Sequence, residues 1–134
     1  MRSARAWLPA IVWAIAILLF SNDPLSAAHT GHPIRVIAEF FAGPLTDAQF
    51  EVVHFAVRKL AHLTEYGILA ALIWRADKRW YVPLACALVL ASLDEWHQSF
   101  VASRTGSPVD VGIDVVGASV GRVVVGVVGR IRRR

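Results

Sequence analysis

The stretch that decides the fold of this chain is residues 109–128, VDVGIDVVGASVGRVVVGVV. Its charged residues are Asp110, Asp114 and Arg122, and most of the others are valine or glycine. The hydrocarbon core of a bilayer is about 30 Å thick, and a helix needs about 20 mostly apolar residues to cross it. The stretch therefore predicts a transmembrane helix.

Three more apolar runs precede this one along the chain. Hydrophobic residues make up 56% of the sequence, and the mean hydropathy of +0.52 is too high for an ordinary soluble domain. A length of 134 residues leaves room for one domain. We therefore expect an all-α fold, in which residues 1–134 form a single four-helix transmembrane bundle. The expected spans, followed by a basic tail at 129–134, are residues 6–20, 55–74, 80–100 and 109–128.

The basic residues stand at the ends of the apolar runs. Nine of the 14 Lys and Arg residues lie before residue 6, in the 75–79 loop or in the tail, whereas residues 21–54 hold four acids and only Arg35. Positive residues collect in cytoplasmic loops, so both termini and the 75–79 loop are predicted to be cytoplasmic. Because the basic residues form no stripe on one face, the net charge of +4 indicates membrane orientation and argues against nucleic acid as a partner.

The segment between the first two runs has its own signals. Residues 34–42 predict a short amphipathic helix on the membrane surface, ended by the Gly-Pro pair that follows. Thr46 and Gln49 have the spacing of a capping box, which starts a helix that continues into the second span. A rival interpretation of the first run is a cleaved signal peptide, because a basic N-terminus, a short apolar core and small residues at 26–28 fit that pattern too.

Polar residues interrupt the second and third runs at regular spacings. Lys59, His62 and Tyr66 are three and four residues apart and share one helix face, with Glu65 at its edge. Each charge at membrane depth costs about 2.5–3.5 kcal/mol on insertion scales, so such residues indicate a function by default. The third run carries four polar residues that cover roughly half of the helix circumference: Asp94, Glu95, His97 and Gln98.

The fourth run begins with Asp110 and Asp114, four residues apart and on one helix face. Gly117 and Gly121 continue that face and form a GxxxG motif, which lets helices in a membrane approach closely. This face is therefore predicted to pack against neighbouring helices. The loop before it, residues 101–108, contains Arg104 together with hydroxyl groups, which suit an anionic phosphate.

In the predicted topology, all these polar residues lie in the outer half of the membrane, and acids outnumber bases among them. Protonated carboxyls, a charged imidazole or a divalent cation such as Mg²⁺, Mn²⁺ or Zn²⁺ would each restore the balance. No fixed metal-ligand spacing is present, so the metal and the cofactor stay open. A buried ion-pair network that only sets the helix register is the structural alternative.

Several motifs resemble those of the VanZ-like family, a set of small bacterial membrane proteins named for a member that lowers susceptibility to the glycopeptide teicoplanin. The motifs are LLFSNDP at 18–24, RKLAHLTEYGILA at 58–70, DEWHQSFVASRTGSPVD at 94–110 and DxxGAxxG at 114–121. The resemblance implies a multi-pass protein of the bacterial cytoplasmic membrane. Asp114 stands where many members have Asn. Carried over onto this sequence, the family pattern marks Lys59, His62, Tyr66, Asp94, Glu95, Gln98, Arg104, Asp110, Gly117 and Gly121.

These features together predict a polar cleft on the extracytoplasmic side that binds or processes a lipid-linked or anionic cell-envelope molecule. The predicted partners are membrane lipid and a lipid-linked cell-wall precursor, and a homo-oligomer is compatible with the sequence. If the protein is an enzyme, it is a hydrolase or transferase acting on a lipid phosphate, since Ser103, Arg104, Asp110 and Asp114 are similar to the last motif of lipid phosphatases, which have His in place of Asp110. The predicted catalytic residues are Asp94, Glu95, Asp110, His62 and Lys59. The predicted substrate-binding residues are Arg104, Gln98, Tyr66, His97, Asp114 and Glu65.

Two other classes of function stay open. A small proton- or ion-coupled transporter would use Glu65, the deepest carboxyl, as a group that alternates its protonation. A non-catalytic membrane adaptor would need the polar residues only for packing. A flux assay on Glu65→Gln separates the first from the second.

Overall fold

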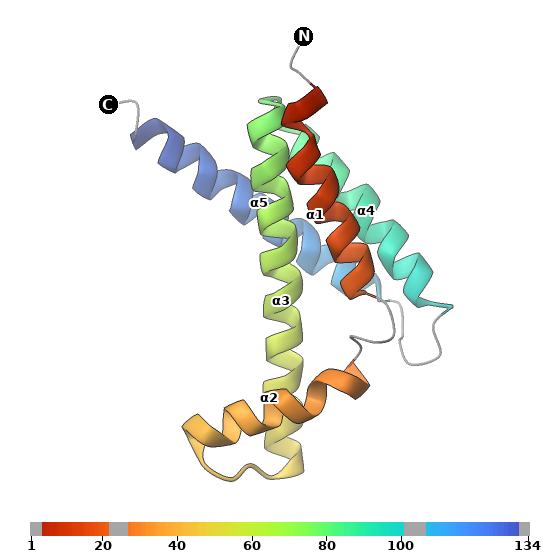
Figure 1. The fold of residues 1–134 in the computed structure, drawn as a ribbon, viewed down its shortest axis with the longest axis vertical. Helices are drawn as coiled ribbons and strands as arrows, with labels where there is room; N and C mark the ends of the chain where they lie inside the picture. Colours follow the sequence, from red (N-terminus) through yellow and green to blue (C-terminus); the bar gives the residue numbers. More distant parts are fainter. Residues whose placement is uncertain (1–3, 22–26, 101–106, 132–134) are drawn as a thin grey trace.

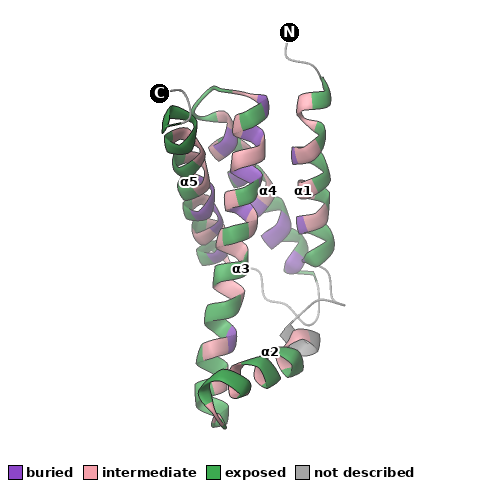
Figure 2. Cartoon of the chain, turned by 60° about the vertical axis from the view of Figure 1, so that its left-hand side comes forward, coloured by how far each residue is buried: buried purple, intermediate pink, exposed green. Residues whose placement is uncertain are grey.

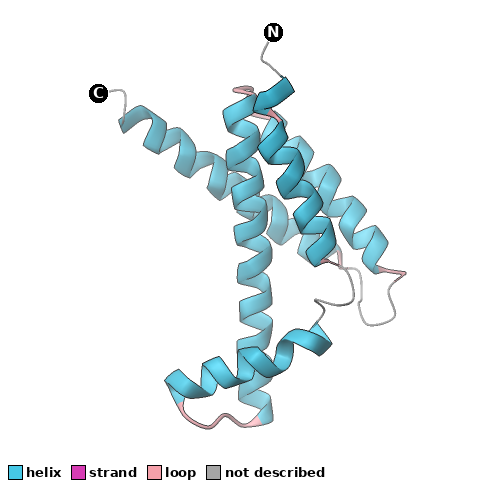
Figure 3. Cartoon of the chain, in the orientation of Figure 1, coloured by secondary structure: helices cyan, strands magenta, loops and turns pink. Residues whose placement is uncertain are grey.

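A computed structural model describes residues 4–21, 27–100 and 107–131. These residues form a short 3₁₀ helix, η1 (Ala4–Ala6), and five α-helices, with no strand in the described ranges (Figure 3). The prediction of an all-α chain is thus confirmed. The α-helices are α1 (Leu8–Phe20), α2 (Ala27–Ala42), α3 (Asp47–Ala76), α4 (Val82–Gln98) and α5 (Pro108–Ile131).

Helices α1, α3, α4 and α5 lie together, while α2 crosses the far end of α3 (Figure 1). Prolines stand in the first turns of α1, α4 and α5, where a missing backbone N–H costs nothing. Helix α2 is longer than the predicted 34–42 segment, since it begins at residue 27 and contains Pro33. It ends where predicted, at Gly43, whose φ of +81° is readily adopted only by glycine.

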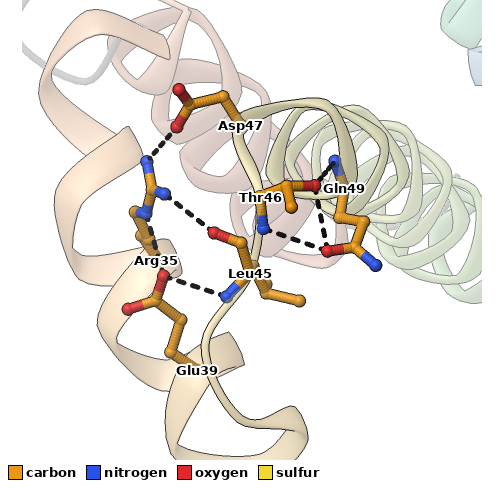
Figure 4. A network of polar contacts seen from close by, with 6 residues as sticks. All are labelled: Arg35, Glu39, Leu45, Thr46, Asp47 and Gln49. Atoms are coloured by element: carbon orange, nitrogen blue, oxygen red, sulfur yellow. Dashed lines mark hydrogen bonds and ion pairs between the residues drawn. The ribbon is translucent and has the colours of Figure 1, made fainter.

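The start of α3 is built as the sequence indicates. The Thr46 side chain accepts a hydrogen bond from the Gln49 backbone N–H at 3.3 Å, and the Gln49 side chain accepts one from the Thr46 N–H at 3.0 Å (Figure 4). This reciprocal pair is the predicted capping box, which satisfies two otherwise unpaired donors. The helix then continues without a break through the predicted second span.

One arginine fastens α2 to the start of α3. Arg35 donates to Glu39 Oε1 at 3.0 Å, to Asp47 Oδ1 at 2.9 Å and to the Leu45 carbonyl at 3.0 Å (Figure 4). The guanidinium, helped by the Leu45 N–H, holds the pKa of the Glu39 carboxyl below its ordinary value. The turn between the two helices is therefore held by charge-assisted hydrogen bonds.

Glycines set the closest helix contact, which is between α3 and α5. A Cβ at Gly117 would lie 2.8 Å from Leu63 Cα, and a Cβ at Gly121 would lie 2.7 Å from Gly67 Cα, both too close for a real side chain. Gly67 packs in return against the Gly117 carbonyl. The GxxxG motif therefore packs as predicted, and residue numbers that increase together along both helices show that α3 and α5 run parallel.

The interior contains an unusual share of polar side chains, and the surface is unusually apolar. The buried positions among the helices are alanines with a few larger residues, together with five ionisable or amide side chains on α4 and α5 (Figure 2). The surface carries many exposed valines, leucines and phenylalanines along α1, α3, α4 and α5. Large exposed apolar surfaces on a folded protein indicate a contact with lipid or with another protein.

By length and composition, α5 is the one described helix that could cross a bilayer, and α1 is a shorter apolar helix of 13 residues. Helix α4 has 17 residues, and α3 is interrupted by charged side chains in its middle. The predicted bundle of four spans is therefore supported at one helix. The helix bounds agree with the expected runs at 6–20, 80–100 and 109–128, whereas α3 extends well before residue 55.

Candidate functional site

Two side-chain pairs, here called the rungs, connect α3 to α5. Lys59 forms an ion pair with Asp110, and His62 Nδ1 lies 3.1 Å from Asp114 Oδ1. Both pairs are shielded, because Asp110 is 7% exposed and Asp114 is 0% exposed. The spacing of three residues on α3 and four on α5 places the rungs one helical turn apart. The predicted polar stripe of the second span thus faces the predicted acidic face of the fourth.

Helix α4 adds a buried carboxyl that is tied to its own helix and to the end of α1. Asp94 is 1% exposed, and its Oδ2 accepts from the Gln98 amide at 2.8 Å and from the Ser21 hydroxyl at 2.7 Å. The sequence predicted Asp94 and Gln98 as site residues, but Ser21 was missed. Ser21 could have been identified from its place in the LLFSNDP motif at the end of α1.

Glu95 lies next to this pair and holds the start of α5. Its Oε2 accepts from the Ser107 backbone N–H at 2.6 Å, and the residue is 6% exposed. Ser107 was also missed, because a backbone donor leaves no trace in the residue type. Since Ser107 directly precedes α5, this contact fixes the end of the α4–α5 connection against α4.

We call the following side chains the polar cluster: Lys59, His62, Tyr66, Asp94, Glu95, Gln98, Asp110 and Asp114. Within the described residues, four buried atoms of this cluster have no hydrogen-bond partner. A buried polar atom without a partner costs about 1–3 kcal/mol, and such atoms in a native protein call for a missing water, ion or ligand. They are Tyr66 Oη, Asp94 Oδ1, Glu95 Oε1 and Asp114 Oδ2.

Three residues of the cluster have the composition of a cation site. His62, Glu95 and Asp114 each offer one ligand atom, and these atoms all lie within 4.8 Å of one another. They come from α3, α4 and α5, so only the packed fold brings them together. The cluster as a whole has four carboxyls against one lysine, which leaves an excess of potential negative charge in a shielded place.

Three residues of the predicted site are not among the eight of the polar cluster. His97 is exposed on α4, because it is about 60° from Asp94 on the side away from Glu95 and Gln98. Glu65 is half-buried, and its backbone carbonyl accepts from the Trp13 indole N–H at 2.9 Å. Arg104, which was expected to hold a phosphate, lies outside the described residues.

Comparison with known proteins gives a single finding. The sequence model of the VanZ/LLP1 family matches residues 6–129, which is nearly the whole chain. No curated protein and no solved structure matches it significantly. The match includes every residue of the polar cluster and both glycines of the α3–α5 contact, and it shows that this chain belongs to the VanZ-like family.

Proposed function

We propose that this chain is a four-span membrane protein whose polar cluster binds or processes a lipid-linked, anionic cell-envelope molecule at the extracytoplasmic side. The observation that carries the proposal is the gathering of buried, partly unpartnered polar groups from three helices beneath an apolar surface. A family that is generally membrane-associated agrees with it.

The distribution of residues supports the membrane location. Side chains such as Leu19, Phe55, Leu88 and Val89 are at least half exposed, while Asp94 is 1% exposed. In water, this arrangement would leave a large apolar surface uncovered. In a bilayer it is the favourable one, since polar groups inside a membrane face the interior of the bundle.

Helix α2 fits the surface of the membrane. Its residues Phe40 and Phe41 are 81% and 82% exposed, and Val36 and Ile37 are more than half exposed. The helix crosses the end of α3 instead of continuing along the bundle (Figure 1). An amphipathic helix in this orientation buries its apolar side chains at the boundary of headgroups and acyl chains.

The basic residues orient the bundle. The α3–α4 connection and both ends of the chain lie at the end of the molecule opposite α2 (Figure 1). Positive residues favour the cytoplasm, which places α2 outside. The polar cluster joins the second half of α4 to the first turns of α5, and it therefore lies in the outer half of the membrane.

The cluster offers groups for both binding and chemistry. Lys59 can stabilise negative charge on a phosphate, and Gln98 and Tyr66 can donate hydrogen bonds. Arg104, between α4 and α5 in the sequence, is proposed to add a further cation. In an enzyme, Asp94, Glu95 or Asp110 would serve as nucleophile or general base, with His62 transferring the proton. In a binding protein, the same groups would only hold the ligand and so change the surface that teicoplanin meets.

A lipid profile of bacteria with and without the protein tests this proposal. We expect a polyprenyl or glycerophospholipid phosphate to change in amount with the intact protein and to be unaffected by Glu95→Gln at equal abundance. Glu51→Gln, an exposed carboxyl on α3, is the matched control and should act as the intact protein does. If profile and teicoplanin susceptibility are the same in all four strains, the proposed function is wrong.

A further inference from the structure

The excess of acid in the polar cluster is concentrated at two carboxyls. Asp110 is paired with Lys59, and Asp94 receives two neutral donors on one oxygen. Glu95 and Asp114 have a backbone N–H and an imidazole, respectively, and no cationic side chain of the described residues is paired with either unless His62 is charged. Two carboxylates in a shielded place need a positive charge nearby or must give up their own.

Both carboxyls are held by one oxygen and leave the other without a partner. Asp114 Oδ1 lies 3.1 Å from His62 Nδ1, while Asp114 Oδ2 has no partner among the described residues. Glu95 Oε2 accepts from Ser107, while Glu95 Oε1 has none within the same ranges. Asp114 is 0% exposed and Glu95 is 6% exposed, so bulk water is not available to these oxygens. One oxygen orients each carboxyl and the second is left for a ligand.

The Glu95 and Asp114 carboxyls form a group with the His62 ring, in which one possible ligand atom from each residue lies within 4.8 Å of the other two. Ligand atoms around one ion at about 2.1 Å lie at most about 4.2 Å apart. Small rotations of the side chains can bring the ligand atoms to the separation that one ion requires. The long Glu95 side chain has the most freedom for such a rotation. The three helices thus present a nearly assembled set of ligands.

We propose that His62, Glu95 and Asp114 bind a divalent transition-metal ion of the Zn²⁺ or Mn²⁺ class. Two carboxylates neutralise a dication, and an imidazole ligand favours a transition metal over Ca²⁺ or Mg²⁺, which prefer oxygen ligands. Three protein ligands leave at least one coordination position open, as in catalytic sites. An oxygen of an anionic headgroup can take that position, a use that rests on the proposed function. The positive charge of the ion also explains how a cluster with an excess of carboxylates can hold an anionic phosphate.

Metal titration of the purified full-length chain tests the site without any lipid substrate. Tag-free protein in nanodiscs is stripped with a chelator and titrated with Zn²⁺, Mn²⁺, Mg²⁺ or Ca²⁺ by calorimetry, and bound metal is counted by mass spectrometry. We expect one Zn²⁺ or Mn²⁺ per chain, bound at least tenfold more tightly than Mg²⁺ or Ca²⁺. His62→Gln, Glu95→Gln and Asp114→Asn should each weaken binding at least tenfold, and Glu51→Gln should leave it unchanged.

Co²⁺ provides a second measurement that does not depend on the variants folding. Its visible absorption bands in the intact protein should indicate coordination by nitrogen and oxygen, and Zn²⁺ should displace it. The site is refuted if no ion binds, if Mg²⁺ binds as tightly as Zn²⁺ and Mn²⁺, or if folded ligand variants keep full affinity. Ion binding with an unchanged lipid profile would refute the proposed function alone. A changed lipid profile without ion binding would refute the metal site alone.

Discussion

Alanine in place of Gly117 or Gly121 should separate α3 from α5 and disrupt the polar cluster. At Gly117, the new Cβ would lie 2.8 Å from Leu63 Cα and 2.9 Å from Leu63 C. At Gly121, it would lie 2.6 Å from Gly67 C and 2.7 Å from Gly67 Cα. The obstructing atoms are backbone, which no rotamer change can move. The two helices must therefore move apart.

The size of the effect follows from these contacts. Ordinary van der Waals contact begins at 3.4 Å, and Leu63 O lies closer to the new Cβ than Leu63 Cα does, so the Leu63 backbone must withdraw by at least about 0.6 Å to admit the Gly117→Ala methyl group. Overfilling a packed interior costs about 1–3 kcal/mol, whereas alanine inside a helix gains about 1 kcal/mol over glycine. The same movement would stretch the 3.1 Å contact of His62 with Asp114 to about 3.7 Å, beyond hydrogen-bond range.

The control is on the same helix, since nothing lies within 4 Å of a Cβ at Gly126. Gly126→Ala should show only the gain in helix propensity. We expect Gly117→Ala and Gly121→Ala to be less stable than Gly126→Ala by about 1–3 kcal/mol in the free energy of unfolding, measured by denaturant titration in micelles. Equal stability of the three variants would show that the α3–α5 contact is looser than described.

Three further predictions concern the α2 end of the molecule. Thr46→Ala removes the side-chain cap of α3 and should cost about 1 kcal/mol, seen as faster hydrogen exchange in the first turn; unchanged exchange would contradict the cap. Arg35 lowers the pKa of Glu39 in the folded state. The Arg35–Glu39 pair therefore stabilises the folded chain fully above the unfolded pKa of Glu39, about 4.3, and this stabilisation is lost as the pH falls through the folded pKa of Glu39. An NMR titration of the Glu39 carboxyl should have its midpoint below that of an unpaired glutamate in the intact chain and nearer to it in Arg35→Gln. The chain has five tryptophans, so Phe41→Trp is compared with the intact chain; the added fluorescence should be quenched by brominated lipids, and an unquenched added signal would place α2 in water.

The sequence predicted which face each helix turns inward. The spacing of Lys59 and His62 indicates one stripe, and that of Asp110 and Asp114 indicates another, and in the structure the two stripes meet. Asp94 and Gln98, four residues apart, differ by about 40° around the helix and share a face, whereas His97 lies about 100° from Gln98 and faces away. Periodicity is therefore enough to find a face.

Periodicity is not enough to find the partners across an interface. Ser21 and Ser107 bond to acids from the ends of other elements, and the Ser107 donor is backbone. The full length of α2 was also missed, because Pro33 and the glycine before it indicate a break where the helix continues. These features depend on tertiary packing, which a local pattern does not encode.

The α3–α5 register connects the glycines to the chemistry of the site. Leu63 faces Gly117 and Gly67 faces Gly121, and the same alignment places Lys59 at Asp110 one to two turns earlier. A slip of one residue would shift one helix by about 1.5 Å along its axis and rotate it by about 100°. Both the Lys59–Asp110 and the His62–Asp114 contacts would then be lost. Small residues that admit one alignment therefore select the partners of every ionisable group in the interface. The proposed metal ligands include one residue from each of these helices. Gly117 and Gly121, which offer no ligand atom themselves, therefore decide whether an ion can bind there.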